Sequence, residues 1–103
     1  MKRAKVFVDR TLAGHLIEYE RGKKYEFRYL DGYRGAQISL TMPTTRQVYS
    51  FDAFPPFFEG FLPEGMMFEF LLQKTKLDAD DRFEQLVLLG SNLVGNLTVE
   101  RES

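Results

Sequence analysis

The chain has 103 residues, of which 44% are hydrophobic and 28% charged, a composition typical of one globular domain spanning residues 1–103. It contains no cysteine and one histidine, which excludes disulfides, thiol nucleophiles, iron–sulfur clusters and zinc sites built from these residues. The net charge of −1 combines +4 over residues 1–34 with −5 over residues 35–103. This polarity suits a charged protein partner and is too weak to indicate nucleic acid.

Targeting and membrane signals are lacking in the sequence. No apolar run follows Met1, Lys2 and Arg3, so no signal peptide is expected. The apolar stretches are much shorter than the ~20 residues that cross a bilayer. We therefore expect a cytoplasmic protein with no membrane contact.

Alternation of apolar and polar residues predicts strands in the first half of the chain. Residues 3–9, 12–20 and 25–29 follow this period, and residues 20–23 predict a hairpin turn between the second and third strands. Residues 37–42 place Ile38, Leu40 and Met42 on one face and predict a further strand, and residues 48–51 predict a short edge strand.

The second half of the chain changes to helical patterns. Residues 57–60 predict one helical turn, and residues 65–74 predict a short helix that is too apolar to be fully solvated. Asp78 is the expected N-cap of a longer helix that contains Phe83 in its core-facing stripe and ends at Gly90. Residues 97–99 predict a last strand. This order indicates an α+β fold, with a small antiparallel sheet of about five or six strands packed against two or three short helices.

Three groups of residues have both a structural and a functional interpretation. The single histidine, His15, lies on an alternating strand without a carboxylate at a recognisable spacing, so we assign it no role. Carboxylates at residues 78, 80, 81 and 84 are typical of a divalent-cation site or of a helix start, and the helix start explains them fully. The strand face of Tyr25, Phe27 and Tyr29 is compatible with base stacking or with a sheet core.

The most distinctive segment is rich in aromatic residues and proline. Eight of the fifteen aromatic residues fall between Tyr49 and Phe70, together with three prolines. Prolines reduce the entropy lost when a loop is ordered by a partner. We predict that side chains of this segment bind a partner protein, with core packing as the alternative for the three phenylalanines, and the candidates are Phe57, Phe58, Phe61, Leu62, Pro63, Glu64, Gly65, Met66 and Met67.

Residues 54–65, Phe-Pro-Pro-Phe-Phe-Glu-Gly-Phe-Leu-Pro-Glu-Gly, resemble the signature of the N-terminal subdomain of HipA-type toxin kinases. Further pieces agree in order, from Val8-Asp9 and Ala13-Gly14-His15-Leu16 to Gly95-x-Leu97-x-Val99. In that family the subdomain precedes a serine/threonine kinase core, whereas this sequence contains no kinase motif. The resemblance therefore implies a separate kinase, as in tripartite HipBST-type toxin–antitoxin systems, whose small HipS-type protein corresponds to the detached subdomain.

The resemblance implies an antitoxin that binds a HipA-like kinase directly, beside a helix-turn-helix DNA-binding protein as a further partner. We expect residues 62–67 to lie near the kinase active site, with Met66 and Met67 as apolar anchors. The family often has tryptophan where this chain has Met66. A structural or activating kinase subunit and a single-stranded nucleic-acid-binding module are the alternatives. We expect neither enzymatic activity nor a cofactor, metal or small-molecule substrate, since no phosphate-binding glycine loop or catalytic loop is found in the sequence.

Overall fold

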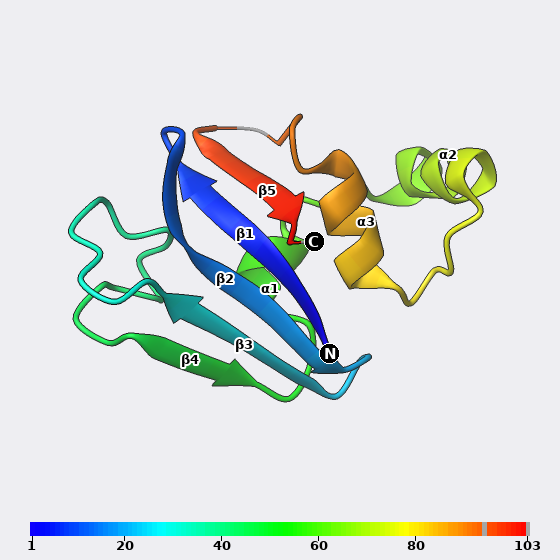
Figure 1. Ribbon diagram of the computed structural model, residues 1–103. Coiled ribbons are helices and arrows are strands. Elements are labelled where there is room, and N and C mark those ends of the chain that lie inside the picture. The colour runs from blue at the N-terminus through cyan, green and yellow to red at the C-terminus, as the bar shows by residue number, and fades with distance from the viewer. Residues whose placement is uncertain (94, 103) are drawn as a thin grey trace.

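The computed structural model describes residues 1–93 and 95–102, which form an antiparallel sheet and three helices (Figure 1). The sheet has the strand order β4-β3-β2-β1-β5. Its strands are β1 (Lys2–Val8), β2 (Thr11–Glu20), β3 (Lys24–Tyr29), β4 (Val48–Phe51) and β5 (Leu97–Arg101). The helices are α1 (Pro56–Glu59), α2 (Gly65–Thr75) and α3 (Arg82–Leu89). The α+β prediction is confirmed, with five strands in the sheet.

Two tight turns build the three-stranded centre of the sheet. The β1–β2 turn consists of Asp9 and Arg10, whose φ angles of 50° and 70° are typical of the type I′ turn that matches strand twist. The predicted turn at residues 20–23 is confirmed. There the Lys23 amide donates to the Glu20 carbonyl at 3.0 Å, and Gly22 has a φ of 75°.

The core lies between one face of the sheet and the helices α1 and α3. α1 lies behind the sheet in Figure 1, and its Phe58 is fully buried. Phe83 and Leu86 of α3 are also fully buried. From the central strands the buried side chains include Ala4, Val6, Val8, Leu16, Tyr25, Phe27 and Tyr29. Alternate residues of β1 and β3 therefore face the helices, as the sequence period predicts.

The prediction of a strand at residues 37–42 is wrong. Ser39 and Met42 form an isolated bridge across a turn, in which the Met42 amide donates to the Ser39 carbonyl at 3.1 Å. The Ile38 amide donates to the Tyr29 hydroxyl at 3.0 Å, and this contact draws Ile38 inward. Ile38 and Met42 are consequently buried, whereas Leu40 at the tip of the turn is 90% exposed.

The start of α3 also differs from the prediction. Asp81, not Asp78, is the N-cap, because its side chain accepts a hydrogen bond from the Glu84 amide at 3.3 Å. Gln85 holds the preceding residues in a loop by donating to the Asp78 carbonyl at 2.8 Å. The predicted end at Gly90 is confirmed, and there the Val99 amide donates to the Gly90 carbonyl at 3.0 Å. A Cβ atom at position 90 would overlap the Val99 carbonyl, so glycine allows α3 and β5 to approach each other closely.

Candidate partner-binding surface

The structure divides the nine predicted partner-binding residues between the core and the surface. Phe58 is 0% exposed and Leu62 6% exposed, so these two side chains offer no surface to a partner. This corrects the expectation for Leu62 and selects core packing, the alternative, for Phe58. Phe57, Phe61 and Pro63 are half-buried, and Phe57 packs edge-to-face on both Phe58 and Phe61. Four of the nine are exposed, namely Glu64, Gly65, Met66 and Met67. The exposed part of the segment therefore begins at Glu64.

Residues 62–67 do not form one continuous loop, because Gly65 is the first residue of α2. Gly65 has a φ of 59°, a conformation that is unstrained only for glycine, and it allows the extended chain at Glu64 to turn into the helix. Met66 and Met67 accordingly lie in the first helical turn. A helix fixes their relative directions more firmly than a loop would.

Helix α2 carries six large apolar residues and has Glu69 and Gln73 on one side, yet none of its residues is buried. Met66 is 89% exposed, Met67 67% and Phe70 56%. Phe70 follows Met66 by four positions and Met67 by three, so its side chain lies between theirs on the helix surface and the three form one exposed ridge. We name Met66, Met67 and Phe70 the α2 ridge. Large apolar side chains on a helix are ordinarily buried, so α2 is the strongest candidate for a surface that a partner covers.

α2 stands at one end of the molecule, with α3 between it and the sheet (Figure 1). On the side facing α3, half-buried Phe68 lies 5.3 Å from the Arg82 guanidinium, measured to the ring centre. The loop that follows α2 is held by Arg21, which pairs with Asp78 at 3.3 Å and Asp81 at 3.0 Å. The Asp81 carboxylate is the main cause of the raised pKa of Arg21. The β2–β3 turn thus fixes the loop that leads from α2 to α3.

An apolar groove of about 480 Å³ runs along α2 where the helix faces the end of α3. Phe61 and Pro63, which precede α2, contribute to it together with residues of α2. Its lining consists of Phe61, Pro63, Met67, Phe70, Leu71, Lys74, Leu89 and Asn92. The α2 ridge and this groove share Met67 and Phe70, so a partner that covers one would also approach the other.

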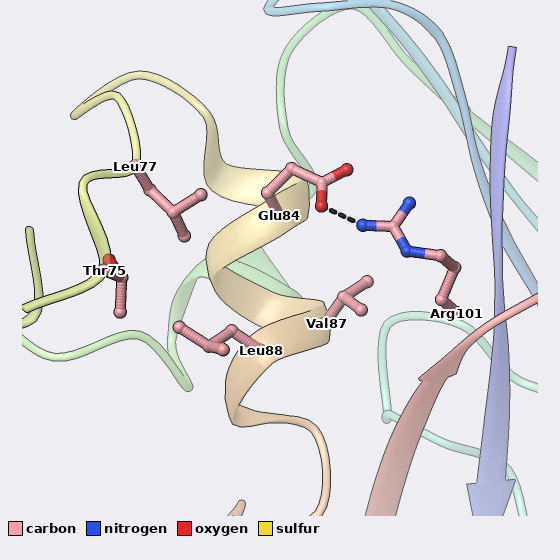
Figure 2. A pocket seen from close by; sticks show the side chains of 6 residues that line it. All are labelled: Thr75, Leu77, Glu84, Val87, Leu88 and Arg101. Carbon is pink, nitrogen blue, oxygen red and sulfur yellow. Dashed lines mark hydrogen bonds and ion pairs between the residues drawn. The ribbon is translucent and has the colours of Figure 1, made fainter.

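A second, smaller pocket of about 190 Å³ lies between α3, β5 and the chain that follows α2 (Figure 2). Figure 2 shows Glu84 pointing to Arg101, with which it forms an ion pair, and Glu84 also pairs with Lys2 at 2.8 Å. Burial would raise the pKa of Glu84, but these two cations outweigh it and hold the pKa below its usual range. The pocket is smaller than the 300–1,000 Å³ common for ligand sites. We assign the ion pairs a structural role, since they join α3 to β1 and β5.

The other residues considered as candidates in the sequence lie in surroundings that indicate a structural role. Tyr25, Phe27 and Tyr29 are at most 3% exposed, so their face has no room for stacked bases. His15 lies 2.7 Å from the Glu102 carboxylate on the uncovered face of the sheet. Within residues 1–93 and 95–102, His, Asp and Glu form no cluster that would hold a metal ion, and none of the helices there is long and apolar enough to cross a membrane.

The sequence interpretation overlooked the second turn of α2 as part of the site. Phe70 belongs to the α2 ridge, and Leu71 and Lys74 line the groove. The sequence does contain a signal for them, which is the helical period. Met66, Met67, Phe70, Leu71 and Lys74 are spaced i, i+1, i+4, i+5 and i+8. Leu89 could not be predicted from its neighbours in the sequence, because only folding brings the end of α3 beside α2.

Comparison with known proteins identifies the fold and the family. The family model described as HipA N-terminal domain matches residues 4–100. The chain belongs to the HipA N-terminal domain family. A solved structure described as the N-terminal domain of HipA toxin has a TM-score of 0.80 at 28% sequence identity, with 100% of this chain and 94% of that chain covered. An uncharacterised protein of Haemophilus influenzae is 28% identical over 102 residues, which are 99% of this chain and 94% of the relative.

Membership of the HipA N-terminal domain family connects this chain with a domain known from a toxin. The matched residues include the aromatic, proline-rich segment and the whole of α2 and α3. The exposed helix is therefore a part of the HipA N-terminal domain and not an addition to it.

Proposed function

We propose that this protein is a HipS-like antitoxin that binds a separate HipA-like serine/threonine kinase toxin and neutralises it by direct contact. The observation that carries the proposal is the exposure of α2, whose ridge of Met66, Met67 and Phe70 is left uncovered by the rest of the domain. Membership of the HipA N-terminal domain family makes a HipA-like kinase core the expected partner. The protein acts in the cytoplasm by binding, without catalysis of its own.

The proposed contact is a helix inserted into a groove of the kinase. Met66 is the most exposed residue of the ridge and lies in the first turn of α2, the end of the helix that follows the Leu-Pro-Glu-Gly sequence. Methionine side chains are flexible and polarisable, and they adapt to irregular apolar pockets. In this proposal the first turn of α2 approaches the kinase active site and blocks substrate binding or closure of the cleft.

A structural or activating subunit would use the same surface, and measured activity separates the two functions. The chain is mixed with the HipA-like kinase encoded beside its gene, and the mass of the complex and the kinase activity are recorded on the same samples. Complex formation with loss of activity supports the antitoxin. Complex formation with activity retained or raised would replace it with a subunit that completes the kinase fold, and a chain that forms no complex would contradict the proposal.

A helix-turn-helix DNA-binding protein is a second proposed partner, in a ternary complex with the kinase. The exposed surface outside α2 includes the uncovered face of the sheet, where Arg3 and His15 both meet Glu102. In this proposal the chain contacts DNA only through that partner. Adding the DNA-binding protein to the purified kinase complex and measuring the new mass tests this assembly.

A further inference from the structure

The groove beside α2 is concave, whereas the ridge projects from the surface, although the two share Met67 and Phe70. Five of its lining side chains are large and apolar, contributed by Phe61, Met67, Phe70, Leu71 and Leu89. Met66, the most exposed ridge residue, does not line it. The groove volume of about 480 Å³ lies within the range of sites that hold bound groups. The ridge is suited to insert into a partner, whereas the groove is suited to receive side chains from one.

Lys74 gives the groove a positive charge. It is the single charged residue among the described residues that line the groove, and it has no ion pair within residues 1–93 and 95–102. Its ammonium group lies 5.6 Å from the centre of the Phe70 ring, at the mouth of the apolar surface. It is also in the last turn of α2, where the helix dipole favours a cation. An approaching carboxylate would therefore meet an unpaired ammonium group beside an apolar floor.

We propose that the groove receives an apolar segment of the kinase that carries an aspartate or glutamate, with the apolar side chains between α2 and Leu89 and the carboxylate on Lys74. This inference rests on the proposed function, because it names the chemistry of the kinase surface that covers α2. It makes the contact reciprocal: α2 inserts its ridge into the kinase, and the kinase inserts a segment beside α2.

Charge reversal at Lys74 tests the inference. We expect Lys74→Glu to weaken binding to the purified kinase about tenfold at low salt, because a like charge then faces the carboxylate, and less at high salt because exposed charges are screened. Lys74→Met keeps the apolar stem and should weaken binding only about threefold. Lys76→Glu is the matched control, because it makes the same charge change two residues away, outside the groove lining. Equal weakening by Lys74→Glu and Lys76→Glu would overturn the inference.

A peptide titration tests the groove without the kinase. Amide spectra are recorded while acetyl-Phe-Leu-Asp-amide or acetyl-Phe-Leu-Lys-amide is added. We expect shifts at Leu71, Leu89 and Asn92 with the aspartate peptide and much smaller shifts with the lysine peptide. Equal shifts with both peptides, or shifts elsewhere, would contradict the proposed chemistry. Failure of the wild-type chain to bind the kinase, with the peptide result retained, would refute the proposed function and leave the groove chemistry in place.

A second copy of this chain is the competing occupant. Light scattering over a range of concentrations would then show a dimer, and Lys74→Glu would change the dimerisation. A monomer at all concentrations supports the kinase segment. A dimer that uses the groove would overturn the inference.

Discussion

Tyr25 illustrates how a single buried phenol holds the centre of the sheet together. Its hydroxyl donates to the Glu18 carboxylate at 2.9 Å and accepts from the Gly22 amide at 2.8 Å. Glu18 is only 5% exposed, so Tyr25 supplies the hydrogen bond that a buried carboxylate requires. Burial is the main cause that raises the pKa of Tyr25 from 10.0 to about 12.

We predict that the domain loses stability between pH 10 and 12. The folded pKa of Tyr25 is the higher one, so the unfolded chain releases this proton first, and the free energy of unfolding falls as pH rises through that window. Urea unfolding at several pH values measures the effect. Burial also raises the pKa of Tyr29, so Tyr25→Phe should remove only a part of the loss. A stability that is unchanged across the window would contradict the prediction.

Arg10 is strained by its place in the β1–β2 turn. Its φ of 70° is a conformation that side chains with a Cβ atom rarely adopt, and it forms no ion pair within residues 1–93 and 95–102. We predict that Arg10→Gly raises the free energy of unfolding by about 0.5–1 kcal/mol, measured by urea unfolding. Arg34→Gly is the control, because Arg34 is also exposed in a loop but has no positive φ. The same gain in both variants would show that removing an arginine charge, not turn geometry, is the cause.

The start of α3 depends on one side chain. Asp81 accepts the Glu84 amide and also pairs with Arg21 at 3.0 Å. We predict that Asp81→Ala destabilises the domain by about 1–2 kcal/mol in thermal or urea unfolding. Asp78→Ala should cost about 0.5 kcal/mol or less, since Asp78 is well exposed and contributes only a surface ion pair. A larger cost for Asp78→Ala would restore the N-cap position expected from the sequence.

Local sequence patterns predicted some elements well. They failed where a contact with a residue distant in the sequence determines the backbone conformation. The strand alternation and the turn around Gly22 are properties of neighbouring residues, and both are confirmed. Ile38 and Met42 have the same alternation but lie in a turn, where both hydrogen-bond to the Tyr29 hydroxyl of β3. Similarly, Gln85 holds the Asp78 backbone in a loop, so a residue with good capping chemistry is not the cap.

The first turn of α2 is the element-scale test of the proposed function. We predict that Met66→Asp combined with Met67→Asp abolishes kinase neutralisation, because charged side chains would replace the exposed apolar anchors. Thermal stability should change little, since α2 contributes no buried residue to the domain. Gln73→Asp is the control on the same helix, because it adds charge at an exposed polar position. Retained neutralisation by the double variant would remove this turn from the mechanism.

At the scale of the whole molecule, one core supports both the sheet and the helices. Phe83 is 0% exposed and brings α3 into the cluster that contains Phe58 and Phe27. We predict that Phe83→Ala destabilises the domain by about 3–5 kcal/mol in urea unfolding. Phe70→Ala, the same change on the exposed ridge, should cost about 0.5 kcal/mol or less. Similar costs at both positions would place Phe83 outside the core.

The sequence selected the segment that leads into the exposed ridge but did not distinguish core from surface within it. Phe57, Phe58 and Phe61 look alike in the sequence, and only the packing of α1 on the sheet places Phe58 fully inside. The exposure of Met66 and Met67 goes against the apolar composition of α2, which predicted a helix that is at least partly covered. The groove could not be predicted, because its walls are more than 15 residues apart in the chain, as Leu71 and Leu89 are.

Helix α2 has 11 residues and no buried side chain, and isolated helices of this length are only marginally ordered in water. The backbone amides of α2 should therefore exchange their hydrogens with solvent by local opening, long before the amides of β1 and β2 do. A partner that covers the helix would slow this exchange. Part of its binding energy would be spent on ordering α2, so the affinity of the complex would be lower than the contact area alone suggests.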